Sequence, residues 1–394
     1  MTPRLAHVLL MTTRYVILRL SSIVRSSGEH STKAADMDIQ IKTRTPLWTG
    51  GVATGQVDRL HETGIIGGLR WWYEAIIRGM GSTACDPGQG ECQFDARKYA
   101  ASSATDTHQR LRDAGLCDVC QVFGATGWRR RFRLEIVNDT TRPVWAGHTP
   151  LNIRPPDRNR GWFLPPGVMG SFTLRFHGDA AIQAQLAWLL LFLERWGHLG
   201  ARAQLGYGVF AIENRAEVAQ FASNLAPPWG TVGESAPDNA YPNLQHFGFF
   251  RYRFQPQHPG WWTQLPGFER VTTRIRPLVA THQTVPLTPV LKNVWRFQLW
   301  QPAWGDERTF WGTLGRERIR SKVLVSWAYP QDGMWAIHGS AWLQGVQDRQ
   351  AVWAMFCNPT CWKQALGIAG ELQTFPAATW QPWSGTTLRA FLET

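Results

Sequence analysis

Apolar residues recur along the first half of the chain at two spacings, one typical of strands and one typical of helices. Alternating apolar and polar side chains predict four strands, which begin behind Met37 and cover residues 39–44, 131–136, 170–177 and 209–212. Apolar side chains three and four positions apart predict two helices, at residues 64–80 and 180–196. The order strand, helix, strand, strand, helix, strand is that of a ferredoxin-like domain.

The second half repeats parts of this pattern after a segment rich in proline and glycine. Aromatic residues at 250, 252 and 254 predict a strand, residues 287–300 a helix, and residues 312–326 glycines followed by a basic strand. We therefore predict an α+β protein with two tandem ferredoxin-like (RRM-like) domains. The predicted parts are an extension at 1–36, a first domain at 37–226 with an insertion at 81–127, a linker at 227–245 and a second domain at 246–394.

Residues 1–36 differ in composition from the rest of the chain. They contain four arginines before the first acidic residue, Glu29, and these arginines interrupt any apolar core of a signal peptide. A transit peptide fits only loosely. Because the strand pattern begins directly behind Met37, we favour Met37 as the true start and expect residues 1–36 to be dispensable.

The predicted helix at 64–80 has a feature that an ordinary amphipathic helix does not need. Gly67 and Gly68 stand directly before Leu69, Arg70 and Trp71. Free N–H groups at a helix N-terminus favour an anion, and glycine lets the backbone approach it closely. We therefore expect a phosphate group to bind where this helix begins.

The charge of the chain favours a polyanionic partner. The formal net charge is +12, and 35 of the 41 basic residues are arginine. Arginine forms paired hydrogen bonds to phosphate and stacks on bases, which favours nucleic acid. An arginine-rich codon usage would explain the excess over lysine but less easily the net charge. The most apolar run, residues 186–193, is too short to span a membrane, so we expect a soluble cytoplasmic protein without membrane contact.

Four of the six cysteines lie in the polar segment at 81–127, and their spacing predicts a metal site. They are Cys85, Cys92, Cys117 and Cys120. A Cys-x-x-Cys pair can present two thiolates to one ion, and a second pair completes a tetrahedron, which favours structural rather than catalytic zinc. Free thiols and a disulfide are the alternatives, the second disfavoured in a reducing cytoplasm. Cys357 and Cys361 are expected to be helix residues instead.

Four motifs resemble a known family by their residues and by their order along the chain. They are Thr45-Pro-Leu-Trp-Thr-Gly-Gly51, Gly67-Gly-Leu-Arg-Trp-Trp-Tyr73, Cys117-Asp-Val-Cys-Gln-Val-Phe-Gly124 and the glycine-rich stretch Gly197–Gly208. The chain resembles the RAMP superfamily of CRISPR proteins, in particular the first RAMP subunit of type III-B (Cmr) effector complexes. The resemblance implies tandem ferredoxin-like domains, binding to guide RNA near its 3′ end in antiviral defence, and target RNA and other RAMP subunits as partners. It also implies a non-catalytic subunit, since the backbone RAMP subunits cut target RNA with a loop aspartate.

We expect RNA to be held mainly through its phosphates, by basic side chains and glycine-rich turns, with unpaired bases stacked on tryptophan. Trp71 and Trp128, each beside an arginine, are the stacking candidates, although burial of at least one of them is the simpler interpretation. The candidate RNA-binding residues are Lys42, Arg44, Gly67, Gly68, Arg70, Trp71, Arg131, Arg133, Arg202, Gly206, Gly208, Arg318, Arg320 and Lys322.

The alternative function is that of a RAMP endoribonuclease. His148, His198 and His338 are candidate acid–base residues, but none stands in a recognisable pair in the sequence. Asp86 and Asp95 are candidates for a cleaving loop aspartate. A zinc-stabilised DNA-binding protein is a third class, although no familiar recognition helix is present. The sequence therefore favours a binding protein without catalytic residues.

Overall fold

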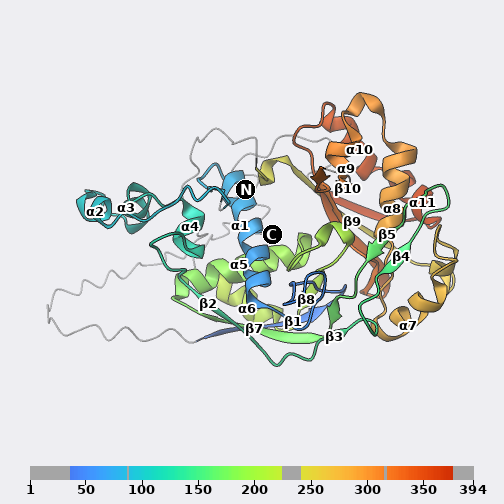
Figure 1. Cartoon of the computed structure of the whole chain (residues 1–394), viewed down its shortest axis with the longest axis horizontal. Coiled ribbons are helices and arrows are strands. Elements are labelled where there is room, and N and C mark those ends of the chain that lie inside the picture. Colours follow the sequence, from blue (N-terminus) through green and yellow to red (C-terminus); the bar gives the residue numbers. More distant parts are fainter. Residues whose placement is uncertain (1–35, 87, 224–240, 315–316, 376–394) are drawn as a thin grey trace, which may run out of the picture. The chain divides into compact units, whose positions relative to one another are not determined.

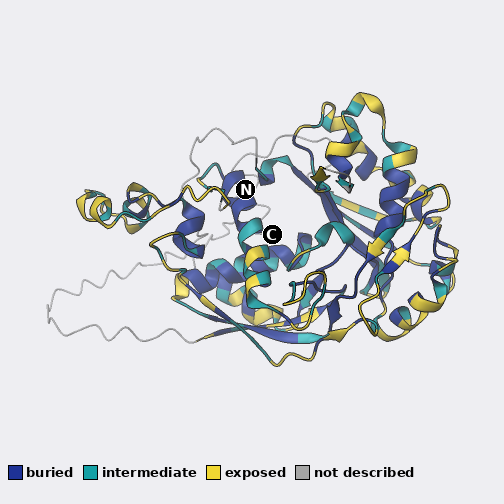
Figure 2. Cartoon of the chain, viewed as in Figure 1, coloured by how far each residue is buried: buried dark blue, intermediate teal, exposed yellow. Residues whose placement is uncertain are grey.

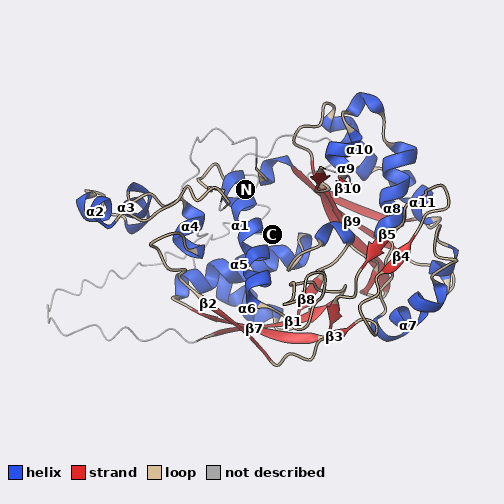
Figure 3. Ribbon diagram, viewed as in Figure 1, coloured by secondary structure: helices blue, strands red, loops and turns tan. Residues whose placement is uncertain are grey.

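The computed structural model describes residues 36–86, 88–223, 241–314 and 317–375, and these form a mixed α+β protein (Figures 1 and 3). Neighbouring strands within each sheet pair antiparallel. The predicted α+β class is thereby confirmed. Nearly all of the predicted extension at 1–36 and most of the predicted linker at 227–245 lie outside the described residues.

The first sheet combines strands from both sides of the cysteine-rich segment. In spatial order its strands are β2 (Arg133–Val137), β7 (Ser171–His177), β1 (Met37–Thr43) and β8 (Phe210–Ile212). Its helices are α1 (Glu62–Gly79), α5 (Ala180–Trp196) and α6 (Arg215–Ser223), the last packed on α5. In β1, Ile39 and Ile41 are buried and Gln40 and Lys42 are exposed, as the alternation predicts.

The second sheet has the same arrangement of strands along the chain and in space. Its spatial order is β12 (Val323–Val325), β14 (Met334–Trp342), β9 (Phe247–Phe254) and β15 (Gly370–Phe375), and β13 (Tyr329–Gln331) also pairs with β14. The helices of this half are α7 (Thr272–His282), α8 (Thr288–Val294), α9 (Glu307–Trp311), α10 (Arg349–Cys357) and α11 (Pro359–Leu366). A π-helical turn, Trp295–Leu299, continues α8.

Three small two-stranded sheets account for the other strands among the described residues. They are β3 (Arg142–Pro143) with β6 (Val168–Met169), β4 (Leu151–Ile153) with β5 (Trp162–Leu164), and β10 (Thr313–Leu314) with β11 (Arg318–Ile319).

Strand β9 is buried on both faces, because the second sheet lies between two sets of helices (Figure 2). On one face, the ring of Phe249 lies 5.8 Å from that of Phe192 and 5.8 Å from that of Trp196, both on α5. On the other face, Phe250 stacks on Phe356 of α10 at 5.3 Å and meets Trp362 of α11 at 5.2 Å. Alternate residues of a strand point to opposite faces of its sheet. The face that carries Phe249 is covered by α5 of the first half, so this helix lies between the two sheets. One continuous core joins both halves.

The sequence predicts a phosphate site where Gly67 and Gly68 begin the first helix, and this position is wrong. Helix α1 begins at Glu62, so Gly67 and Gly68 lie in its second turn, beyond the free N–H groups of the N-terminus. A Cβ atom on Gly68 would lie 2.9 Å from the carbonyl oxygen of Gly200, and one on Gly64 would lie 2.2 Å from that of Thr49. These two glycines let loops of the chain pack closely against the helix.

The expected basic strand in the second half is also wrong, because the chain breaks it into two elements. Arg318 belongs to β11 in a small hairpin, whereas the main sheet resumes at Val323. Arg318 and Arg320 are exposed, but Lys322 is half-buried and donates to the carbonyl oxygen of Gln344 at 2.7 Å. The three cations therefore do not share one strand face.

Candidate metal centre and RNA-binding surface

The structure brings together the four cysteines of the predicted metal site, whose sulfur atoms all lie within 4.8 Å of one another. Cys117 caps α4 (Asp118–Phe123), and its Sγ accepts the N–H of Cys120 at 3.5 Å. The sulfur of Cys120 lies 3.4 Å from that of Cys85, and the sulfur of Cys92 accepts the N–H of Cys117 at 3.3 Å. Two short helices, α2 (Ala96–Ala101) and α3 (Thr107–Asp113), occupy the chain between the two cysteine pairs.

The surroundings of three thiols in this cluster shift their pKa values in different directions. Hydrogen bonding with Cys120 lowers the pKa of the Cys117 thiol to about 5. Burial raises the pKa of Cys85 to about 12, and the hydrogen bond with Cys117 raises that of Cys120 above its ordinary value.

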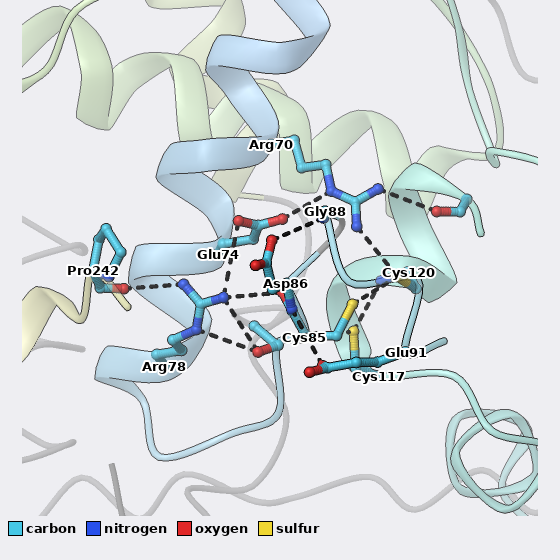
Figure 4. A network of polar contacts seen from close by, with 12 residues as sticks. Arg70, Glu74, Arg78, Cys85, Asp86, Gly88, Glu91, Cys117, Cys120 and Pro242 are labelled. Atoms are coloured by element: carbon cyan, nitrogen blue, oxygen red, sulfur yellow. Dashed lines mark hydrogen bonds and ion pairs between the residues drawn. The ribbon is translucent and has the colours of Figure 1, made fainter. Parts of the chain in front are cut away.

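Arg70 supports this cluster from α1 (Figure 4). Its Nη2 donates to the sulfur of Cys120 at 3.3 Å, its Nη1 to the carbonyl oxygen of Gly124 at 3.2 Å, and its Nε to Glu74 Oε1 at 2.8 Å. A cation beside a sulfur ligand stabilises the charged thiolate. The guanidinium of Arg70, an RNA-binding candidate from the sequence, is therefore engaged with the cysteine cluster.

A buried ion pair holds the same segment together. The Asp118 carboxylate accepts two hydrogen bonds of 2.7 Å from Arg112, lies 3.1 Å from His108 and accepts a hydrogen bond from the Ser82 hydroxyl. Burial opposes ionisation of Asp118, but these hydrogen bonds outweigh it and hold the pKa of the carboxyl below its usual range. Asp118 thereby joins α3, α4 and the loop after α1.

The donor set of this cluster fits a structural metal. Four sulfur donors suit a borderline or soft ion in tetrahedral geometry, and a closed set of four leaves no position for a reacting water. Cys92 and Cys120 also belong to a small core with Leu111 and Leu116 that is separate from the main core. An ion held there would order a segment that has little apolar surface of its own to bury. Cys357 and Cys361 lie in α10 and α11, as expected.

Four RNA-binding candidates lie on or beside the first sheet: Lys42, Arg44, Arg131 and Arg133. Arg131 is ion-paired with Asp179 at 2.6 Å, and Arg133 with Glu135 at 2.8 Å. Lys42 is exposed and Arg44 is half-buried. The face expected to be basic therefore carries acidic partners as well.

The glycine-rich loop at 197–208 packs against the second half of the chain. The guanidinium of Arg202 lies 3.7 Å from the ring centroid of Trp48. Gly206 and Gly208 are buried, and a Cβ on Gly206 would lie 2.4 Å from Trp327 Cδ1. The backbone at these two glycines contacts protein, and neither is exposed to solvent.

The two tryptophans expected to stack on bases contact other aromatic rings. Trp71 meets Trp72 edge-on at 4.9 Å and Phe247 at 6.2 Å. Trp128 lies 5.0 Å from Phe94 and donates its Nε1–H to the Gln121 carbonyl oxygen at 3.1 Å. Both are half-buried, and Gly67 beside the first of them is exposed on α1.

A buried lysine ties this loop to the second sheet. Lys292 of α8 donates from Nζ to the carbonyl oxygens of Gln204 and Val323, each at 2.7 Å, and to the hydroxyl of Ser321 at 3.2 Å. Burial lowers its pKa to about 7. In the unfolded chain the lysine keeps its ordinary pKa near 10.4. Between these two values the unfolded state binds more protons, so the lysine makes stability rise with pH.

We expect the free energy of unfolding of the wild type, minus that of Lys292→Met, to rise by up to about 1.4 kcal/mol per pH unit from pH 7 to pH 9. Denaturant unfolding of both proteins at several pH values measures this difference. Other titrating groups are common to both proteins and cancel. A difference that stays flat or falls over this range would contradict the lowered pKa.

The hairpin β4–β5 forms a basic, aromatic surface that the sequence analysis missed. Arg154 and Arg160 are exposed, and the guanidinium of Arg158 lies 3.2 Å from the ring centroid of Phe297. Phe163 and Phe297 are large apolar side chains that are 58% and 36% exposed. Three arginines within seven residues, followed by Trp-Phe, were the signal in the sequence.

The candidate catalytic residues occupy different environments. His198 and His338 are buried with their rings 5.3 Å apart, and burial lowers the pKa of His198 to about 3 and holds that of His338 well below its usual range. His148 is exposed. Asp95 caps α2 by accepting two backbone N–H groups, and Asp86 accepts the N–H of Gly88 at 2.8 Å.

The comparisons with known proteins confirm the resemblance to RAMP proteins. Residues 40–211 match the model of the RAMP superfamily. Comparison with curated proteins finds no match.

Several solved structures are similar over most of their length. One is apo Cmr1 from Pyrococcus furiosus, with 15% identity, a TM-score of 0.38, and coverage of 79% of this chain and 88% of that chain. Another is in a type III-B Cmr-beta complex bound to cognate target RNA and AMPPnP, in the presence of single-stranded DNA, with 10% identity, a TM-score of 0.39 and coverage of 84% and 98%. A third is in Cmr-beta bound to cognate target RNA, with 10% identity, a TM-score of 0.34 and coverage of 90% and 98%. Among the described residues, no helix is long and apolar enough to cross a membrane.

Proposed function

We propose that this protein is a non-catalytic RNA-binding RAMP subunit of a type III-B CRISPR effector complex, where it contacts guide RNA near its 3′ end and neighbouring RAMP subunits. The superfamily match of residues 40–211 supports this assignment. Each sheet also has the chain order strand, helix, strand, strand, helix, strand and the same spatial order, which supports two tandem ferredoxin-like domains.

The RNA-binding role rests on one observation: some arginines are ion-paired with carboxylates, and others are not. On the first sheet, Arg131 and Arg133 are neutralised by carboxylates. The ion pairs among the described residues include none of the arginines on hairpins β4–β5 and β10–β11, which are Arg154, Arg158, Arg160, Arg318 and Arg320. Largely exposed guanidinium groups outside these ion pairs suit the phosphates of a single strand, and the Phe297 ring beside Arg158 suits a base.

The surroundings of three candidate catalytic residues favour binding over catalysis. His338 is fixed by hydrogen bonds to the Tyr329 hydroxyl at 2.8 Å and the Gly197 carbonyl oxygen at 3.0 Å, away from solvent. Asp95 serves as a helix cap, and His198 is buried and neutral at physiological pH. A general acid or base must reach the substrate and titrate near the working pH.

We further propose that the cysteine cluster holds one structural zinc ion. Four sulfur donors with a Cys-x-x-Cys pair suit tetrahedral zinc, and α4 and the loop after α1 supply them in one place. The ion would fix the segment between α1 and β2, to which Arg70 connects the first helix.

Replacing Arg158 and Arg160 together by alanine is expected to weaken binding of single-stranded RNA to a similar extent for unrelated sequences. Phosphate contacts release counterions, so the slope of log affinity against log salt should flatten by roughly 1.4, about 0.7 for each phosphate that the variant no longer neutralises. Titrations of labelled RNA at several salt concentrations measure both quantities. The pair Arg318 and Arg320 should behave similarly.

The matched control replaces Arg59 and Arg215, two exposed arginines that are ion-paired with Glu62 and Glu194. This variant loses the same charge but should retain the slope. An unchanged slope in the Arg158/Arg160 variant would remove this hairpin from the RNA path. Copurification that yields neither RNA nor RAMP subunits, or RNA cleavage by pure protein, would contradict the proposed function itself.

A further inference from the structure

A cavity of about 210 Å³ lies beside α9 in the second half of the chain. Its walls include Trp300, Trp304 and Phe310, and Lys322 and Gln347 also line it. None of the three aromatic residues was assigned a role by the sequence analysis. The cavity combines flat apolar walls with a cationic and an amide group, which is the usual composition of a small-ligand site.

The aromatic walls are held in fixed orientations. Trp300 stacks on Phe310 with ring centroids 5.0 Å apart and an interplanar angle of 22°, and it meets Trp304 edge-on at 5.5 Å. The Nε1–H of Trp300 donates to the carbonyl oxygen of Gly305 at 3.3 Å, which anchors that ring. Phe310 is buried, whereas Trp300 and Trp304 are half-buried, and one face of the Trp300 ring is already covered by Phe310. Trp304 is therefore the wall on which an entering flat ring can stack.

Two charged side chains of opposite sign, Lys322 and Asp306, line the cavity. The Asp306 carboxylate is engaged at the start of α9, where it accepts the N–H groups of Arg308 at 3.1 Å and Thr309 at 3.0 Å. The ammonium group of Lys322 donates one hydrogen bond, to the Gln344 carbonyl oxygen at 2.7 Å, and has two further protons.

We propose that this cavity takes one unpaired nucleobase of a bound RNA strand, stacked on Trp304, with the adjoining phosphate at Lys322. A flat aromatic ring with a neighbouring anion is the ligand class that such a site recognises. The proposal rests on the proposed RNA-binding function and adds a base site to its phosphate contacts. A free mononucleotide has the same chemistry, and the test separates the two sources.

The test compares Trp304→Ala and Trp304→Phe in the full-length protein, with a melting curve for each. The probes are a labelled single-stranded oligouridine, an abasic strand of the same length, and uridine monophosphate. Trp304→Ala should lose about tenfold in affinity for oligouridine and retain its affinity for the abasic strand, because only the first can stack. Trp304→Phe should restore most of the loss.

The matched control is Trp145→Ala, another half-buried tryptophan, whose Nε1–H donates to the Thr149 carbonyl oxygen at 3.1 Å. It should leave both affinities unchanged. An equal loss for both strands in Trp304→Ala would show a structural effect and overturn the proposal, as would no loss for either. Binding of uridine monophosphate that depends on Trp304, with unchanged oligouridine binding, would assign the cavity to a free nucleotide and also overturn it.

Failure of this proposal can be told apart from failure of the proposed function. If wild-type protein binds oligouridine with a salt slope that depends on Arg158 and Arg160, but Trp304 has no effect, only the base site is wrong. If wild-type protein and its assembled complex bind neither strand, both are wrong.

Discussion

Replacing Cys117 by serine is expected to reduce bound zinc from about one ion per chain to near zero and to unfold the segment between α1 and β2. Structural zinc sites contribute about 10–16 kcal/mol of apparent binding free energy in finger peptides, far more than the small core of this segment can supply. The two sheets should stay folded, since their core is separate from the cluster core. Metal analysis and limited proteolysis of residues 81–127 measure the two effects.

The control for this variant is Cys357→Ser, which changes a half-buried thiol of α10 far along the chain from the cluster. It should retain the ion and the protease resistance of the segment. Wild-type protein with a zinc content near zero, or Cys117→Ser with an unchanged content, would refute the metal assignment.

Replacing Phe249 by alanine is expected to destabilise the whole described chain by about 3–5 kcal/mol, the range for buried Phe-to-Ala changes. Phe249 is fully buried and packs against Phe192 and Trp196 of the first half. Because both halves share one core, denaturant unfolding should show one transition that shifts as a unit.

Phe163→Ala is the comparison for this second variant. Phe163 is 58% exposed, so its loss should change the free energy of unfolding by no more than about 0.5 kcal/mol. Two separate transitions in Phe249→Ala, of which only one moves, would show that the halves fold independently and that the shared core contributes little.

The sequence located an element best where its hydrophobic periodicity coincides with a capping residue or a glycine at its ends. Helix α5 has the predicted bounds because Asp179 caps its start and Gly197 ends it. Helix α1 begins earlier than expected because glycine within a helix looks like a boundary, although here it admits a neighbouring loop. Helix α7 was missed, since Pro277 lies inside it.

The candidate sites were predictable only as far as they depend on residues that are close together in the sequence. Cysteine spacing along the chain is enough to suggest a metal cluster, and the four residues are together in the structure. Which arginines are available to RNA depends on partners that are distant in the sequence, such as Asp179 for Arg131. The same holds for the aromatic cavity, where Phe310 and Gln347 meet only in the folded chain.

The burial of β9 on both faces has a consequence for how the protein is made. Helix α5 and its aromatic residues leave the ribosome well before β9, and β15, the last strand of the second sheet, ends at Phe375. Until then Phe192 and Trp196 have no sheet to cover them, and exposed apolar surface on a nascent chain promotes aggregation. The partly synthesised chain must therefore be protected from aggregation in the cell. Its first half stops exposing this apolar surface only when the second half has been synthesised and has folded onto it.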